Sequence, residues 1–159
     1  MSKFESGMEA MVDMYIYETT TLLEQLDQIL MKTETASEFE SEDINEIFRI
    51  MHTIKGSSAM MGLENIASLA HAIEDMFYII REDKPVIKDI KKLYELVFNA
   101  SDLLKAEIDL IQEDEYTATD FSATKNNIEE YVTVLKSGEP APVKEEKAAP
   151  KAQAPSASA

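Results

Sequence analysis

The sequence predicts an all-α protein: an antiparallel up-down four-helix bundle with a fifth, C-terminal helix packed outside it. The 159 residues include only four glycines and five prolines, and four of these prolines come after residue 139. The body of the chain is therefore almost free of residues that break helices. Within it, apolar residues recur every three or four positions, as they do on one face of an amphipathic helix. Short connections between such helices favour antiparallel neighbours.

The first two helices are predicted from this periodicity and from the residues that bound them. The first carries its apolar stripe from Met8 to Leu30, and the polar segment 33–40 is expected to be a connection. Ser41 offers a capping side chain for the second helix, and the acids after it complement the helix dipole. Gly62 should end that helix. Its predicted core stripe consists of Ile44, Ile47, Met51, Ile54, Ser58 and Met61.

The remaining three helices follow the same pattern. The third is expected over about 64–81, and it must end before Pro85 because proline disfavours helical backbone in the residue that precedes it. The fourth covers about 87–112, the polar segment 113–120 connects it to the fifth, and the fifth covers about 121–136. The apolar residues of these helices again repeat at helical spacing.

The composition changes after residue 136 and predicts a domain boundary there. Residues 1–136 read as one five-helix domain. Residues 137–159 are rich in proline, alanine and lysine and have almost no large apolar side chains. Such a segment cannot bury enough surface to offset the entropy lost on ordering. We interpret it as a disordered linker that leads to domains absent from this chain.

The charge and the absence of cysteine exclude several classes of function. The formal net charge is −16, so phosphate backbones and anionic lipid surfaces would repel the protein. A nucleic-acid partner and membrane insertion are therefore not expected. The chain has no cysteine, which rules out disulfides and thiolate metal sites. It also has no apolar run of signal-peptide or membrane-spanning length. These properties favour a cytoplasmic location.

One face of the second predicted helix carries the candidate functional residues. Lys55 and Gly56 follow His52 by three and four positions, so all three lie on one face. His52 is about 120° from the centre of the core stripe, at ~100° per residue. Its imidazole should therefore face solvent at the edge of a groove between helices. A mid-helix glycine costs about 1 kcal/mol relative to alanine, and access to His52 is the simplest reason for Gly56.

The third predicted helix supplies a pair of side chains for this histidine. His71 and Glu74 are three residues apart and share one helix face. His52 precedes Gly62 by ten residues and Glu74 follows it by twelve, so both reach a similar height in an antiparallel hairpin at ~1.5 Å per residue. We therefore predict a hydrogen bond between them. A carboxylate that accepts the imidazole N–H fixes the tautomer and leaves the other nitrogen unprotonated.

These residues resemble those of the histidine-phosphotransfer (HPt) family. The segment 47–62 contains His52-Thr53-Ile54-Lys55-Gly56-Ser57-Ser58 and looks most like the phosphotransfer domains of chemotaxis kinases of the CheA type. The later His-x-x-Glu pair favours this subfamily over other HPt domains. The resemblance implies that His52 is the phosphorylated nucleophile and that Glu74 orients it. It also implies charge neutralisation by Lys55, support of the network by His71 and steric access at Gly56.

The resemblance further implies a phosphoryl carrier. A separate kinase domain, which binds ATP and Mg²⁺, would phosphorylate His52, and an aspartate of a CheY- or CheB-like response regulator would then receive the group. The chain itself has no glycine-rich phosphate-binding loop, and no cofactor or metal is expected in it. It would be the phosphoacceptor part of a protein histidine kinase without a complete active site.

Three alternatives remain open from the sequence. The first is a phosphorelay HPt protein that acts outside chemotaxis. The second is a metal-binding bundle that uses His52, His71 and Glu74. Di-metal bundles, however, carry their ligands in the order Glu-x-x-His and project them inward, whereas these residues have the reverse order and lie off the core stripes. The third alternative is a purely structural helical module.

Overall fold

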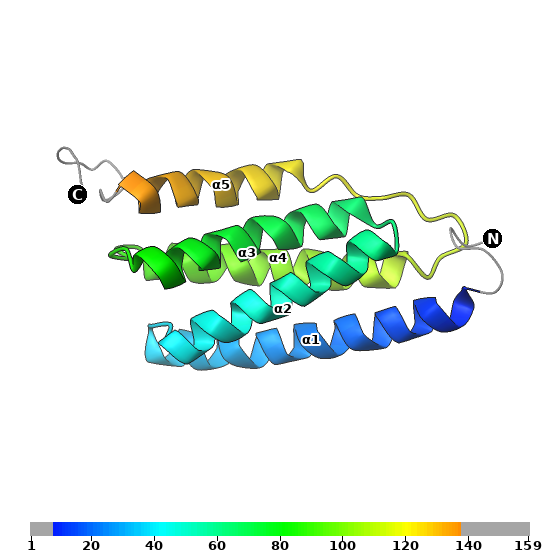
Figure 1. Ribbon diagram of the computed structural model, residues 1–159, viewed down its shortest axis with the longest axis horizontal. Coiled ribbons are helices and arrows are strands. Elements are labelled where there is room, and N and C mark those ends of the chain that lie inside the picture. Colours follow the sequence, from blue (N-terminus) through cyan, green and yellow to red (C-terminus); the bar gives the residue numbers. More distant parts are fainter. Residues whose placement is uncertain (1–7, 138–159) are drawn as a thin grey trace.

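The structure, a computed structural model, describes residues 8–137. Figure 1 shows helices that lie alongside one another with alternating direction. Within the described residues there are five helices and no strand, which confirms the predicted all-α class. The helices are α1 (Glu9–Ala36), α2 (Ser41–Met60), α3 (Glu64–Asp83), α4 (Ile90–Leu110) and α5 (Ser122–Ser137). The predicted linker, apart from Ser137 at the end of α5, lies outside the described residues.

The first four helices form a closed bundle, and α5 packs outside it. Helix α1 contacts α2 and α4, α2 packs most extensively on α3, and α3 also contacts α4. Helix α5 lies against α3 and α4, at the edge of the molecule in Figure 1. This arrangement agrees with the predicted four-helix bundle and outer fifth helix. No helix in residues 8–137 is both long enough and apolar enough to cross a membrane.

Buried apolar side chains from all five helices form one continuous core. Two polar side chains join inside it, because the Tyr15 hydroxyl and the Ser58 hydroxyl lie 2.7 Å apart across the α1–α2 interface. Ser58 is fully buried, as expected for a member of the α2 core stripe. Its hydrogen bond to Tyr15 satisfies a group that would otherwise destabilise the core.

Helix α1 is longer than the sequence predicted. The segment 33–36, expected to be a connection, is its last turn, and the helix ends at Ser37 with φ 59°. Thr33 is buried against the rest of the bundle, and its hydroxyl donates locally to the carbonyl oxygen of Leu30 at 3.0 Å. The backbone N–H of Ser37 in turn donates to the Thr33 carbonyl at 2.7 Å. The connection to α2 shrinks accordingly.

Helix α2 begins and ends where predicted, although a different residue caps its start. Glu40 and Asp43 form a reciprocal capping box, and Ser41 is the first helical residue instead of the cap. Asp43 accepts the Glu40 backbone N–H at 3.0 Å, and Lys32 Nζ lies 2.7 Å from the same carboxylate. Gly62 has φ +77°, a conformation that glycine adopts without strain. It allows the tight turn that sets α2 and α3 antiparallel.

Candidate functional site

The α2–α3 hairpin brings His52 and Glu74 together. His52 Nδ1 lies 2.6 Å from Glu74 Oε2, which confirms the predicted hydrogen bond. The histidine side chain is 64% exposed, whereas that of Glu74 is 8% exposed. The expected orientation of His52 toward solvent is thus confirmed, and the carboxylate that holds it comes from the interior of the helix pair.

Lys55 provides the charge that a buried carboxylate requires. Its ammonium Nζ lies 2.7 Å from Glu74 Oε1, so each carboxylate oxygen has its own partner. Burial by itself would raise the pKa of the Glu74 carboxyl. The hydrogen bonds and positive charges of Lys55 and His52 outweigh burial and hold this pKa below its ordinary value of 4.5. Glu74 is therefore an anion at neutral pH, and Lys55 is a half-buried partner of it rather than a free surface cation.

This arrangement determines which nitrogen of His52 is available. In the neutral ring, Nδ1–H donates to the Glu74 carboxylate, so Nε2 carries the lone pair. Because the ring is mostly exposed, Nε2 is accessible to a reagent in solution. The carboxylate also stabilises any positive charge that develops on the ring during attack. The geometry suits a nucleophile that serves partners outside this chain.

Gly56 leaves open space one turn after His52. A Cβ atom placed on Gly56 would meet no heavy atom within 4 Å, so packing inside the domain does not require glycine at this position. The residue is exposed and lies within α2. The missing side chain at Gly56 therefore matters more for the approach of a partner molecule than for packing of the core.

Replacement of Gly56 by alanine should stabilise the domain. The free energy of unfolding should rise by about 0.5–1 kcal/mol, because alanine has the better helix propensity and meets no clash. Urea denaturation followed by circular dichroism measures this. Gly62→Ala is the matched control and should instead be destabilising, because φ there is +77°. A less stable Gly56→Ala variant would show that this glycine has a structural role inside the domain.

His71 lies on the same helix as Glu74 but has a different partner. Its Nε2 is 3.4 Å from Asp75 Oδ2, and both side chains are exposed. The structure brings His52, Glu74 and Lys55 together in one network, with Gly56 beside them, whereas the polar partner of His71 is Asp75, which is not part of that network.

Sequence reasoning missed an aromatic neighbour of His52 and the two side chains that contact this neighbour. The ring of Phe48 stacks on the imidazole, with centroids 6.2 Å apart. The guanidinium of Arg81 lies over the Phe48 ring, and Tyr78 contacts the same ring. The signal was available, because Phe48 lies four residues before His52 and Tyr78 four after Glu74, which places each pair on one helix face.

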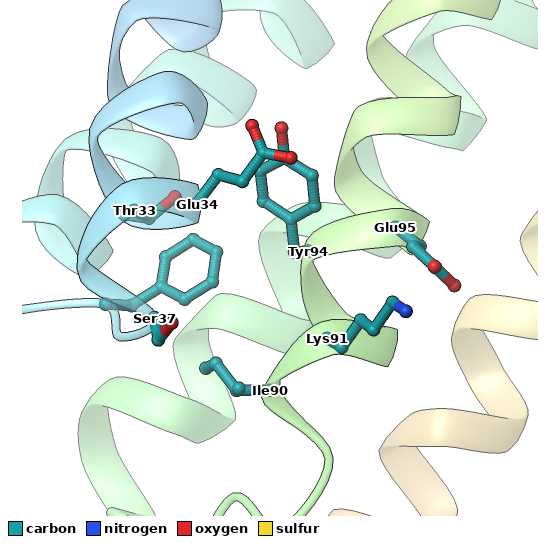
Figure 2. Close-up of a pocket in the computed structure, with 8 residues that line it drawn as sticks. Thr33, Glu34, Ser37, Ile90, Lys91, Tyr94 and Glu95 are labelled. Carbon is teal, nitrogen blue, oxygen red and sulfur yellow. The ribbon is translucent and has the colours of Figure 1, made fainter.

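Metal binding and a cavity elsewhere in the described residues offer no alternative site at this network. Within residues 8–137, no group of three or more His, Cys, Asp or Glu side chains could hold a metal ion. A cavity of about 290 Å³ lies between the end of α1 and the start of α4. Figure 2 shows the Glu34 carboxylate beside the ring of Tyr94; both residues line this cavity, as does Lys91. Burial, and then the charge of Glu34, raises the pKa of the Tyr94 hydroxyl.

Comparison with known proteins identifies the family. The family model described as the Hpt domain matches residues 10–114. The chain belongs to the Hpt domain family. This assignment agrees with the exposed histidine on α2 and with the resemblance that segment 47–62 carries.

Relatives of this Hpt domain include much larger proteins. The sensor histidine kinase CheAY of Helicobacter pylori is 33% identical over 80% of this chain, and the chemotaxis protein CheA of Borreliella burgdorferi is 28% identical over 79%. The chemotaxis protein CheA of Listeria monocytogenes is 30% identical over 75%. The chain spans only 15%, 14% and 19% of the length of these three relatives, respectively.

A solved structure shares the fold of this Hpt domain. It is the crystal structure of the phosphorylated P1 domain of CheA3 in complex with CheY6 from R. sphaeroides. The TM-score is 0.71 at 21% identity, and the match covers 80% of this chain and 99% of that chain. The likeness extends over nearly the whole P1 domain.

Proposed function

We propose that this Hpt domain is the phosphoryl carrier of a CheA-type chemotaxis histidine kinase. His52 Nε2 accepts the γ-phosphoryl group of ATP from a separate kinase domain and passes it to an aspartate of a CheY- or CheB-like response regulator. The observation that carries the proposal is the exposed His52 ring, whose Nδ1 is bonded to the buried Glu74 carboxylate, so that the neutral ring keeps its lone pair on Nε2. The CheA names of the relatives support the chemotaxis assignment.

The transfer consists of two displacements at phosphorus. In the first, the Nε2 lone pair attacks the γ-phosphorus, an N–P bond forms, and the P–O bond to ADP breaks. The Nδ1 proton stays on the ring, and the resulting positive charge faces the Glu74 carboxylate. In the second, an aspartate oxygen of the regulator attacks the same phosphorus. The N–P bond then breaks, and its electron pair returns to Nε2.

Lys55 and Gly56 assist these steps in different ways. The Lys55 ammonium has three N–H donors. One faces Glu74, so the others can face the phosphoryl oxygens at Nε2 and partly neutralise their charge. Gly56 leaves the approach to His52 without a side chain, so that a partner's active site can come close. ATP and Mg²⁺ belong to the partner kinase domain, and the exchange takes place in the cytoplasm.

The decisive experiment is phosphorylation of the purified chain by a CheA catalytic domain with γ-labelled ATP. We expect an acid-labile, base-stable label that maps to residue 52, as for a phosphohistidine. A chase with CheY, CheB and a receiver domain from an unrelated phosphorelay then tests the pathway. Preference for the chemotaxis regulators supports the CheA assignment, and preference for the unrelated receiver favours a phosphorelay outside chemotaxis. An unlabelled chain, or a label at another residue, would refute the carrier role.

His71 should support the network less strongly than Glu74 does. Its contact is with the exposed Asp75, at 3.4 Å, so it acts on His52 only across the helix surface. We expect His71→Asn to slow phosphorylation by less than about threefold, equivalent to roughly 0.6 kcal/mol in the barrier. Single-turnover phosphorylation at saturating kinase domain measures this. A loss as large as that of a Glu74 variant would show that His71 acts on the nucleophile directly.

A further inference from the structure

Beside the exposed His52 ring lies a cluster of side chains that the proposed phosphorylation chemistry does not use. The Phe48 ring lies nearly parallel to the imidazole, with an interplanar angle of 13° and centroids 6.2 Å apart. Tyr78 and Arg81, both from α3, contact this phenyl ring. We call Phe48, Tyr78 and Arg81 the aromatic–arginine stack.

The stack holds Phe48 in place from the neighbouring helix. Arg81 Cζ is 4.3 Å from the centroid of the Phe48 ring and 5.6 Å from that of Tyr78. A cation over an aromatic face at these distances is attracted to it. Arg81 Nε also donates to Glu82 Oε2 at 2.8 Å. Phe48 is half-buried, and its orientation is therefore determined by α3 as well as by its own helix.

One hydrogen bond does not fix the plane of an imidazole. The contact between Nδ1 and Glu74 determines which nitrogen is protonated, but the ring can still tilt about this bond. A parallel neighbour on the ring face opposes such a tilt, since aromatic pairs favour offset stacking at this separation. Phe48 lies one helical turn before His52 and is the aromatic side chain that stacks on it.

We propose that Phe48, held by Arg81 and Tyr78, is a positioning residue that fixes the plane of the His52 ring for phosphoryl transfer. This inference rests on the proposed carrier function and extends it to residues that do not touch the phosphoryl group. The Nε2 lone pair lies in the ring plane, so a tilted ring directs it away from the line of attack on phosphorus. Small errors of alignment reduce rates strongly in reactions that depend on positioning.

The test compares Phe48→Leu with Phe48→Tyr in this chain. The leucine variant keeps an apolar side chain and removes the ring, whereas the tyrosine variant keeps the ring. We expect Phe48→Leu to lower kcat for phosphorylation by about fivefold to tenfold without a change in KM for the domain, and Phe48→Tyr to retain the rate. Arg81→Met, which keeps a long side chain but removes the cation, should have a smaller effect in the same direction.

A second measurement separates positioning from general stability. The order parameter of the His52 ring, from ¹³C relaxation at its Cε1 position, should fall in Phe48→Leu and stay unchanged in Phe48→Tyr. Phe98→Leu is the matched control. Phe98 stacks on Tyr94 with centroids 5.9 Å apart at 11°, so its loss removes a similar pair from α4, and both His52 readouts should stay as in the wild type.

These readouts distinguish the two proposals. An unchanged rate or an unchanged ring order parameter in Phe48→Leu would overturn the positioning role, even if His52 is phosphorylated normally. Equal changes in Phe98→Leu would overturn it as well, because they would show a general loss of stability. If the wild-type chain takes up no label at residue 52, the carrier function fails, and the positioning role for phosphoryl transfer fails with it, whatever the ring order parameter shows.

Discussion

Replacement of Glu74 by alanine should slow phosphorylation of His52 about 10- to 100-fold and leave the helix content unchanged. The variant removes the acceptor for Nδ1–H, which lies 2.6 Å from the carboxylate. Both tautomers of the ring then become populated, and the positive charge that develops during attack loses its counterion. In buried catalytic triads, replacement of the orienting carboxylate by its amide costs about 10⁴-fold. The His52 side chain is 64% exposed, so water replaces part of the lost interaction and the effect here should be smaller.

Two further variants make this prediction specific. Glu74→Gln keeps an oxygen that can accept the Nδ1 proton but removes the negative charge, so its rate should lie between those of the wild type and the alanine variant. Asp75→Ala is the matched control, because Asp75 is the next residue, is exposed and contacts His71 instead of His52. Single-turnover phosphorylation measures the rates, and circular dichroism measures the helix content. Unaltered phosphorylation of Glu74→Ala would refute the role assigned to this carboxylate.

The pH dependence of the Glu74 contacts has a definite sign. In the folded protein these contacts hold the Glu74 carboxyl pKa below 4.5. Their contribution to stability is therefore present above the unfolded-state pKa and is lost as the pH falls through the lower folded-state pKa. Between pH 5 and pH 8 the carboxylate therefore stays ionised. Any change in the rate of phosphorylation across this interval must come from another group.

Much of the site could be predicted from the sequence because it is local. His52, Lys55 and Gly56 share one helix face through their spacing alone. The position of Glu74 follows from the distance of each residue to Gly62, since a tight turn leaves little freedom in the register of an antiparallel hairpin. The helices and the bounds of α2 could be predicted from apolar spacing and from glycine, because these signals are also local in the sequence.

The missed features depend on burial and on side-chain contacts, neither of which is visible in residue spacing. The last turn of α1 looked like a loop because its residues are polar, but Thr33 is buried and that turn remains helical. The contact of Arg81 with Phe48 requires the crossing geometry of α2 and α3, which residue spacing does not provide. Glu107 is a third case, because it lies in the apolar stripe of α4 and its partners are in other segments.

Of the substitutions proposed for this chain, loss of the Glu107 carboxylate should cause the largest change in the free energy of unfolding. This side chain is 1% exposed, and one of its oxygens, Oε2, accepts three hydrogen bonds. The donors are the Asn65 amide at 2.9 Å, the Thr119 backbone N–H at 3.0 Å and the Tyr116 hydroxyl. Asn65 is on α3, whereas the other two donors belong to the connection between α4 and α5. The carboxylate thus fixes that connection, and with it the approach to α5, against α3.

Glu107→Ala should lower the free energy of unfolding by about 3 kcal/mol, because it removes the buried, charged acceptor that three hydrogen bonds share. Glu107→Gln keeps a carbonyl oxygen at that position and should lose only about 1 kcal/mol, the difference between a charged and a neutral acceptor. Glu113→Ala, an exposed change a few residues further along the chain, should be nearly neutral. Urea denaturation at pH 7 measures all three.

The pH dependence provides an independent check on Glu107. Burial alone would raise the pKa of this carboxyl, but the hydrogen bonds from Thr119, Tyr116 and Asn65 outweigh burial and lower it from 4.5. Its stabilising contribution should be complete above about pH 4.5 and should be lost as the pH falls through the lower folded-state value. The stability of Glu107→Gln should therefore fall less steeply with acid than that of the wild type. Parallel curves for the two proteins would contradict this account, because they would show that the ionised carboxylate is not what holds the α4–α5 connection in place.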